Sequence, residues 1–167
     1  MSQYICVDIG GTSIKHGVLD ENAIIKECNQ TKTEAWLGGA AVLDKVKTIG
    51  KQYKEQYENI EGICISTAGM VDPEEGKIVF AGELMPDYTG TCIKKELEKA
   101  LEMPCEVEND VNCAGLAEYV SGSAKESHIM FCATVGTGIG GCAIVNGRVF
   151  HGASNSACEV GYIPMGD

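Results

Sequence analysis

The sequence predicts an α/β fold, and two features carry that prediction. Apolar segments of strand length stand at the start and again near the end of the chain, and each leads through a cluster of glycines into a second apolar strand. Between these two strand-turn-strand units, apolar residues recur at helical spacing over long stretches. Strands joined by sharp turns and covered by amphipathic helices are typical of a layered α/β domain.

Three short apolar runs at the N-terminus predict three sequential antiparallel strands, at 4–9, 14–19 and 23–31. Asp20-Glu21-Asn22 supplies turn residues between the second strand and the third. The segment 34–57 follows, and its apolar residues recur at helical spacing despite three glycines. It therefore predicts one long amphipathic helix or two that abut.

The middle of the chain predicts further strands and a second helix. A buried strand at 62–65 ends in the loop Ser66-Thr67-Ala68-Gly69, and a short strand follows at 77–81. Thr91 is a candidate N-cap for the next helix, which ends before Pro104.

The last third repeats the pattern of the first. A strand at 105–108 leads into a helix at 111–120, which carries a narrow apolar stripe. Strands at 128–134, 141–145 and 148–150 then form the second unit, and an Asn-Gly pair predicts a hairpin turn between the last two.

The composition describes a globular chain and argues against two classes of partner. With 167 residues, 44% of them hydrophobic, the chain has ample material for a packed core. Its net charge of −11 repels a polyphosphate backbone, so we expect no nucleic-acid partner. No apolar run approaches the length of a membrane span, and the N-terminus runs directly into a strand without a leader. We therefore expect a cytoplasmic protein without a membrane partner.

The nine cysteines predict reduced and mostly buried thiols rather than a disulfide framework. Their number is odd, their spacings are irregular, and several stand inside apolar runs. The sequence has no Cys-x-x-Cys pair, so a structural zinc site is not expected.

The first glycine cluster has the composition of a phosphate-binding turn. Asp8 ends a predicted strand, where its carboxylate can hold Mg²⁺ directly or through water. The backbone amides of Gly10, Gly11 and Thr12 and the Thr12 hydroxyl can meet phosphate oxygens, and Lys15 adds positive charge. The structural alternative is a tight hairpin in which the glycines are needed only for their dihedral angles.

The second cluster, Gly136-Thr137-Gly138-Ile139-Gly140-Gly141, admits the same two interpretations. It occupies the equivalent place in the second strand-turn-strand unit. Structural turns that arise independently need not match in this way, and the match favours a pair of phosphate-binding turns.

Asp110 is the second carboxylate of interest. It stands between an apolar strand and a helix, where a loop can direct a side chain into a cleft as a general base. The alternative is an N-cap, although Asn109 can also provide the cap and leave Asp110 for chemistry. Glu159 has a weaker case, since a lone loop glutamate is normally solvated.

Three motifs in this order resemble the ROK family of bacterial sugar kinases and sugar-responsive repressors: residues 8–15, Glu108-Asn109-Asp110, and the second glycine cluster, with a later Glu159-x-Gly161. The resemblance implies an actin-like fold of two ribonuclease-H-like lobes, in which a mixed sheet is flanked by helices. It places a first lobe at 1–120 and the opening strands of a second, incomplete lobe at 121–167.

The resemblance also implies roles for individual residues. Those that line the two phosphate loops are Gly10, Gly11, Thr12 and Lys15 in the first, and Gly136, Thr137, Gly138 and Gly140 in the second. Those near the sugar are Gly69, Asn109, Asp110, Glu159 and Tyr162. Asp110 is the base that activates the accepting hydroxyl, and Asp8 holds Mg²⁺ through water.

Two departures from the family pattern narrow the expectation. Members with a structural zinc carry Gly-His after the conserved glutamate and a cysteine cluster downstream, whereas this chain has Gly161-Tyr162 and ends before such a cluster. We therefore expect no zinc, and a similarity to the zinc-less branch that includes β-glucoside kinases. The family's second lobe also continues well past residue 167, where the adenosine-binding residues would lie.

The resulting expectation is an ATP-dependent, Mg²⁺-requiring carbohydrate kinase that acts on a hexose or β-glucoside, as a homodimer. This chain alone would be inactive. The alternatives are a sugar-sensing regulator of the same family, which would need a DNA-binding domain ahead of the first strand, and a non-catalytic sugar- or nucleotide-binding lobe.

Overall fold

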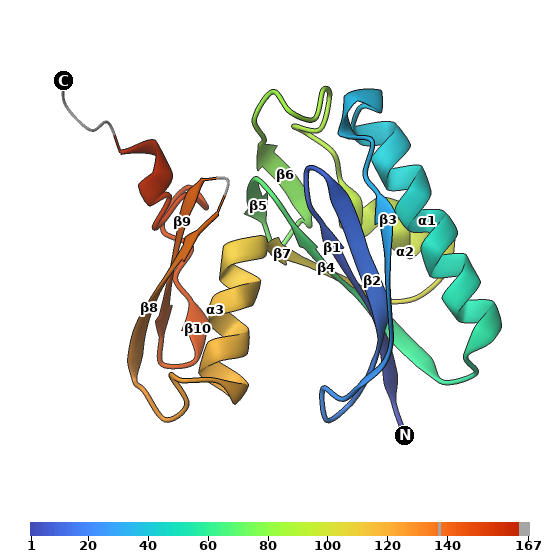
Figure 1. The fold of residues 1–167 in the computed structure, drawn as a ribbon, viewed down its shortest axis with the longest axis horizontal. Coiled ribbons are helices and arrows are strands. Elements are labelled where there is room, and N and C mark those ends of the chain that lie inside the picture. The colour runs from blue at the N-terminus through green and yellow to red at the C-terminus, as the bar shows by residue number, and fades with distance from the viewer. Residues whose placement is uncertain (137, 164–167) are drawn as a thin grey trace. The chain divides into compact units, whose positions relative to one another are not determined.

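The computed structural model describes residues 1–136 and 138–163, which form two compact units, Met1–Glu108 and Asn109–Asp167 (Figure 1). Each unit is described here by itself. Among the described residues, no helix has the length and apolar character of a membrane span.

The first unit is built on a five-stranded sheet in the order β3-β2-β1-β4-β7. Its strands are β1 (Gln3–Ile9), β2 (Ser13–Asp20), β3 (Ile25–Lys32), β4 (Ile60–Thr67) and β7 (Cys105–Asn109). The first three strands run antiparallel to one another, as predicted, and β1 pairs with β4 in parallel. The sheet is therefore mixed.

Alternation along β1 explains how the sheet buries one face. Ile5, Val7 and Ile9 are buried, whereas Cys6 and Asp8 between them are half-buried, because successive side chains of a strand point to opposite faces. Helices α1 (Gly39–Gln56) and α2 (Ile93–Leu101) pack against each other, and their buried side chains share one core with β1 (Figure 1). The other face carries Asp8.

The predicted helix at 34–57 begins later than its apolar pattern indicates. Residues Ala35–Leu37 form a 3₁₀ turn, η1, and Gly38 then takes φ 87°, a left-handed value that stops the turn before α1 starts. Trp36 and Leu37 belonged to the predicted apolar stripe, but both are exposed. The stripe inside α1, from Val42 to Tyr53, is buried as expected.

A small hairpin of β5 (Met70–Asp72) and β6 (Lys77–Phe80) follows β4. The sequence predicted the second of these strands and missed the first, which is only three residues long. The predicted cap at Thr91 is also wrong, because the N-cap residue of α2 is Cys92, whose side chain makes no capping hydrogen bond.

The second unit packs helix α3 (Asp110–Ser121) on a three-stranded antiparallel sheet in the order β10-β9-β8. Its strands are β8 (Ile129–Val135), β9 (Ile139–Val145) and β10 (Arg148–Val149), and the short 3₁₀ turn η2 (Val160–Tyr162) contacts β9. All three strands were predicted, with shifted ends. The two compact units divide after Glu108, so α3 belongs with these strands; the lobe boundary after residue 120 stays a prediction.

The cysteines are less buried than the sequence predicted. Only Cys105 and Cys142 are buried, Cys28 and Cys64 are exposed, and the other five are intermediate. All nine are free thiols, in agreement with the prediction of reduced cysteines. Their position inside apolar runs was misleading because alternate residues of a half-covered strand face solvent.

Candidate functional site

Asp8 lies on the face of the first sheet opposite the core that α1 and α2 share with β1, between two polar side chains. The strand register pairs it with Lys15 on β2 and with Ser66 on β4, so all three side chains are neighbours on one face. Ser66 Oγ donates to Asp8 Oδ1 at 2.8 Å, and Lys15 Nζ lies 4.0 Å from Asp8 Oδ2. The Asp8 side chain is 42% exposed, so a hydrated cation can reach this carboxylate.

The first glycine turn, residues 10–13, joins β1 to β2 beside Asp8. It is closed by a hydrogen bond from the Gly10 N–H to the Ser13 carbonyl at 3.1 Å, and Gly11 and Thr12 are exposed. Gly11 does not have a positive φ, and a Cβ built on it would meet none of the described residues within 4 Å. Neither dihedral angle nor packing within the described chain requires glycine there. The turn has room for a ligand at Gly11, and its phosphate-binding role stays a prediction.

The second glycine turn, residues 136–141, divides into an open part and a packed part. A Cβ on Gly136 or Gly138 would meet none of the described residues within 4 Å. A Cβ on Gly140, by contrast, would lie 2.4 Å from Cγ2 of Val111 on α3, so this glycine has a packing reason of its own. Thr137 lies outside the described residues. The phosphate-binding role of this turn stays a prediction.

The start of α3 resolves which of two residues provides its cap. Asn109 has extended backbone angles, and its Oδ1 accepts hydrogen bonds from the amides of Val111 at 2.9 Å and Asn112 at 3.1 Å. This is the geometry of an N-cap. Asp110 is the first residue of the helix, where its carboxylate accepts from Asn109 Nδ2 at 3.0 Å. Asp110 Oδ1 also accepts from the Val111 amide at 2.9 Å, so Asp110 shares one of the two amides that Asn109 caps.

Two predicted sugar-site carboxylates, Asp110 and Glu159, interact within the second unit. Glu159 is half-buried just before η2. Burial, and then the negative charge of Asp110, raise the pKa of the Glu159 carboxyl. Such coupling requires the two groups to lie near each other, although they are far apart in the sequence. A raised carboxyl pKa beside a second carboxylate is a feature of functional sites.

The other two residues implied near the sugar have different surroundings. Gly69 takes φ 103° in the bend from β4 to β5, and a Cβ there would lie 2.8 Å from the Phe80 carbonyl oxygen, so backbone geometry alone requires glycine. Tyr162 is exposed in η2. Contact of either residue with a sugar stays a prediction.

Sequence reasoning missed Ser66 and Thr33, each of which contacts a predicted residue. Ser66 bonds Asp8, and the buried Thr33 donates from Oγ1 to the Gly10 carbonyl at 2.6 Å. Both contacts depend on which strands are neighbours, which a single sequence does not specify. The polar residue at the end of each strand was the available signal.

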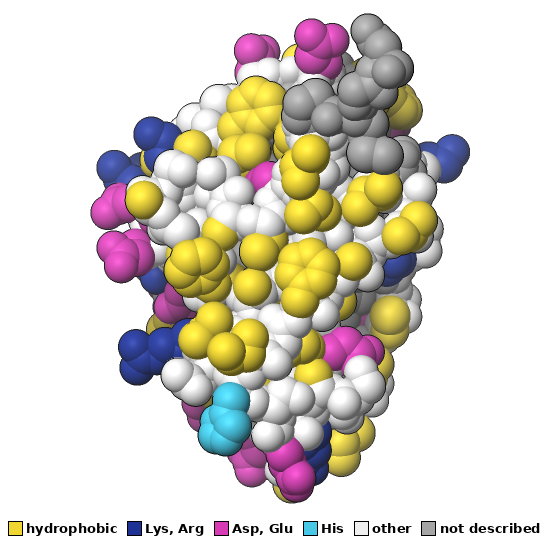
Figure 2. Space-filling view, turned by 90° about the vertical axis from the view of Figure 1, so that its left-hand side faces the viewer, with side chains coloured by type: hydrophobic (Ala, Val, Ile, Leu, Met, Phe, Trp, Pro, Cys, Tyr) yellow, Lys and Arg dark blue, Asp and Glu magenta, His cyan; other side chains and the backbone are white. Residues whose placement is uncertain are grey.

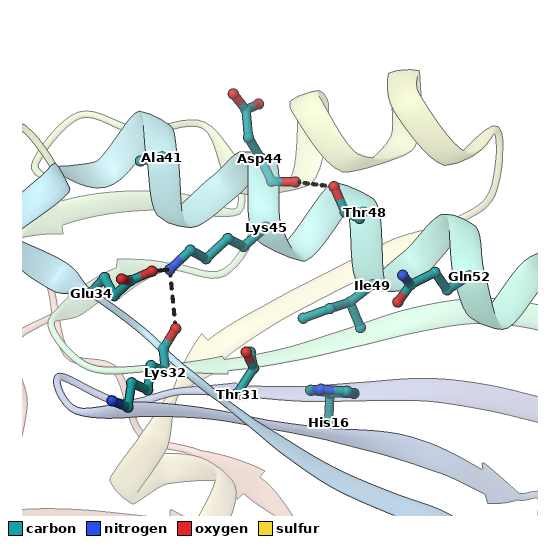
Figure 3. A pocket seen from close by; sticks show the side chains of 10 residues that line it. All are labelled: His16, Thr31, Lys32, Glu34, Ala41, Asp44, Lys45, Thr48, Ile49 and Gln52. Atoms are coloured by element: carbon teal, nitrogen blue, oxygen red, sulfur yellow. Dashed lines mark hydrogen bonds and ion pairs between the residues drawn. The ribbon is translucent and has the colours of Figure 1, made fainter.

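A separate hollow of about 750 Å³ lies between α1 and strands β2 and β3 (Figure 3). His16, Lys45 and Gln52 are among its lining residues. His16 shares the buried face of β2 with Ile14 and Val18, whereas Lys15 points to the opposite face. The hollow is therefore distinct from the surroundings of Asp8. Among the described residues, no group of three His, Cys, Asp or Glu side chains could hold a metal ion.

Comparison with known proteins gives consistent likenesses. A family model described as the ROK family matches residues 4–167. The chain is 53% identical to an uncharacterised protein of Clostridium perfringens, over 98% of this chain and 55% of that protein. It is 33% identical to the β-glucoside kinase of Listeria monocytogenes, over 93% of this chain and 51% of the kinase. The chain thus spans about half the length of these relatives.

Solved structures extend the likeness to the fold. A ROK family glucokinase from Streptomyces griseus, in complex with glucose and AMPPNP, superposes with a TM-score of 0.85 at 31% identity, over 97% of this chain and 50% of the glucokinase. A ROK family transcriptional regulator superposes with a TM-score of 0.82 at 20% identity, over 96% of this chain and 41% of the regulator. The predicted α/β fold of the actin-like sugar kinases is confirmed.

Proposed function

Because the chain belongs to the ROK family, we propose that it serves an ATP-dependent sugar kinase, which transfers the γ-phosphoryl group of ATP to a hydroxyl of a hexose or a β-glucoside. One observation carries the proposal: an accessible carboxylate, Asp8, stands beside a glycine turn with open space at Gly11. A carboxylate next to bare backbone amides suits a nucleotide's phosphates and their cation.

The first unit would bind and orient the phosphates. The amides of the first glycine turn and the ammonium of Lys15 would donate to phosphate oxygens, which carry most of the negative charge. Asp8 would hold Mg²⁺ through water, and the ion, when bound, would neutralise charge at the phosphate oxygens. Ser66 keeps Asp8 turned toward this position by its hydrogen bond.

The second unit would provide the base. Asp110 would accept the proton of the sugar hydroxyl as that oxygen attacks the γ-phosphorus, and ADP would leave with the electrons of the broken bond. Asn109 supports this role by occupying the N-cap of α3 and by donating from Nδ2 to the Asp110 carboxylate, which orients it. Glu159, held beside Asp110, would hydrogen-bond the sugar.

The substrate would belong to the hexose and β-glucoside class. Relatives at about the same identity include glucokinases and β-glucoside kinases, which supports the class without choosing within it. Tyr162 in place of the family histidine favours the branch without zinc, and we propose that the protein carries none. We also propose a cytoplasmic homodimer.

A sugar-sensing regulator is the second candidate, because a ROK family regulator shares the fold. That likeness is under 25% identity and speaks for the fold alone, whereas the named kinases exceed 30%. The placement of the Asp110 carboxylate next to the N-cap residue, near a second carboxylate at Glu159, also favours a kinase over a non-catalytic binding lobe.

A coupled assay of ADP release from the full-length protein tests the proposal. Glucose, N-acetylmannosamine, fructose and cellobiose should be offered separately with ATP and Mg²⁺, with the Asp110→Asn variant as control. We expect ADP release that depends on one of these sugars and is lost in the variant. Tight sugar binding without ADP release would instead favour the regulator or the binding lobe.

A further inference from the structure

We propose that Thr33 is a positioning residue for the first glycine turn, which it binds from the buried side. Thr33 follows β3 and is fully buried. Its hydroxyl donates to the Gly10 carbonyl at 2.6 Å, and its backbone N–H donates to the Thr12 carbonyl at 3.1 Å. One residue therefore binds carbonyl oxygens on both sides of Gly11. That the turn binds phosphate rests on the proposed function.

The two hydrogen bonds determine which way the turn presents its amides. In a planar trans peptide the C=O and the following N–H point in opposite directions. Fixing the Gly10 carbonyl on the buried Thr33 hydroxyl thus turns the Gly11 N–H away from the core, toward the exposed side of the turn. The Gly10 and Thr12 carbonyl oxygens, which would repel a phosphate, point toward Thr33 instead. The turn is organised for an anion before one binds.

Lys45 supports Thr33 from the helix side. Its ammonium extends from α1 to the end of β3, where it donates to the carbonyl of Lys32 at 3.1 Å and pairs with Glu34 (Figure 3). It also donates to the carbonyl of Thr33 at 2.9 Å. The end of β3 is therefore tied to α1 on one side and to the glycine turn on the other. This chain of contacts makes the position of the turn depend on α1.

Two substitutions at Thr33 separate the effect of losing the hydroxyl from the effect of changing the side-chain volume. Thr33→Val keeps the shape and removes the donor, whereas Thr33→Ser keeps the donor. In the full-length protein, we expect Thr33→Val to speed hydrogen exchange of the Gly10 and Thr33 amides about tenfold, the scale of one lost buried hydrogen bond. The KM for ATP should rise by a similar factor while the KM for the sugar stays unchanged. Thr33→Ser should resemble the wild type in both measurements.

Thr67→Val is the matched control. Thr67 is equally buried, and the substitution removes its hydroxyl contacts with Tyr88 at 2.7 Å and with the Ala68 carbonyl at 3.2 Å, neither of which lies in the turn. It should lower thermal stability without changing exchange at Gly10. If Thr33→Val does not fold, Lys45→Met should give the same changes to a smaller degree.

Two outcomes are distinguishable. Unchanged exchange at Gly10 in both Thr33→Val and Lys45→Met would overturn the positioning role, whatever the enzyme does. If hydrogen exchange at Gly10 is faster in the variants, the positioning role is supported. If, in addition, the wild-type protein phosphorylates no sugar, that second result counts against the proposed function and not against the positioning role.

Discussion

The hydroxyl of Ser66 binds the carboxylate of Asp8 across two parallel strands, with 2.8 Å between Ser66 Oγ and Asp8 Oδ1. The second oxygen, Oδ2, lies 4.0 Å from Lys15 Nζ. One carboxylate oxygen is thus held by a neutral donor, and the other faces the exposed ammonium of Lys15. A strand far along the sequence therefore sets the orientation of the proposed Mg²⁺-binding group.

Replacing Ser66 with alanine should let the Asp8 carboxylate rotate away from this orientation, because its hydrogen bond with Ser66 is lost. We expect Ser66→Ala to lower kcat/KM for ATP roughly tenfold, because a hydrogen bond to a charged group contributes about 1.5 kcal/mol or more. The Mg²⁺ concentration for half-maximal activity should rise in parallel. Ser66→Thr, which keeps the hydroxyl, is the control. Wild-type Mg²⁺ dependence in Ser66→Ala would show that Asp8 does not need this bond.

The role of Asp110 can now be separated from helix capping. Asp110→Asn should leave α3 intact, because Asn109 is the N-cap and an asparagine at 110 keeps an oxygen that can accept from the Val111 amide. We expect kcat to fall by roughly 10² to 10⁴ while ATP affinity stays close to normal, the usual scale for a lost general base. Steady-state kinetics and nucleotide titration of the full-length protein measure the two effects.

Asn109→Ala provides the comparison for capping. It should cost about 1 kcal/mol of unfolding free energy, since it removes the acceptor for two amides at the start of α3. Near-normal turnover in Asp110→Asn, together with a stability loss like that of Asn109→Ala, would identify Asp110 as structural.

Glu159 should make stability depend on pH in an unusual direction. Because its pKa is raised, the folded state binds a proton more readily than the unfolded state, and this contribution to stability is lost as pH rises through the raised pKa. Glu159→Gln should therefore raise the melting temperature at pH 7 to 8. The gain should shrink as pH falls toward 4.5, the usual value for a glutamate.

Glu118 is the matched contrast within the same unit. Hydrogen bonds from the Ser123 N–H and then its hydroxyl lower the pKa of Glu118. Its stabilising contribution is present at neutral pH and lost as pH falls through the lowered pKa, so Glu118→Gln should lower the melting temperature at pH 7. Differential scanning fluorimetry of both variants from pH 4 to 8 tests the pair. If both variants change the melting temperature in the same direction at pH 7, the opposite pKa shifts assigned to Glu159 and Glu118 are contradicted.

Cys64 should be the most reactive thiol of the chain. A hydrogen bond with Cys6 lowers the pKa of Cys64 to about 7, and the residue is exposed. Iodoacetamide should modify Cys64 first, at a rate that rises through pH 7, and Cys6→Ala should slow it. Cys105, whose pKa burial raises to about 12, should stay unmodified in the folded chain. Peptide mapping by mass spectrometry identifies the modified residue.

Local pattern predicted the elements better than their ends and neighbours. A short apolar run identified β1, whose Ile5, Val7 and Ile9 all face one core. The end of η1 depended on the left-handed backbone of Gly38, which spacing does not reveal. At Cys92, the expected capping threonine was one residue too early.

The residues of the candidate site also fall into two groups, those that the sequence indicated and those that it did not. Asp8, the glycines and Asp110 could be named as candidates because their residue types stand next to predicted strands, where loops often carry function, and their roles stay predictions. Thr33 and Ser66 could not, because their contacts cross between strands whose order and register emerge only on folding. Their bonds are tertiary, and one sequence carries no record of them.

The last prediction concerns the apolar face of β8, formed by Ile129, Phe131 and Val135. These side chains are 72%, 58% and 84% exposed, because the strand's other face packs toward α3. Figure 2 shows hydrophobic side chains gathered on one side of the molecule. An uncovered apolar strand of this kind is a site of association. We expect the 167-residue chain to self-associate in a concentration-dependent manner.

Substitution on this face should weaken the association selectively. Burying a large apolar side chain contributes roughly 1.5 to 3 kcal/mol, so the double variant Ile129→Thr, Phe131→Ser should raise the dissociation constant at least tenfold. Trp36→Ser is the control, since Trp36 is 70% exposed but lies in η1 of the first unit. Sedimentation velocity over a range of concentrations measures all three proteins. If the wild-type chain stays monomeric throughout, or if Trp36→Ser weakens association as much as the double variant, then the β8 face is not what brings the copies together.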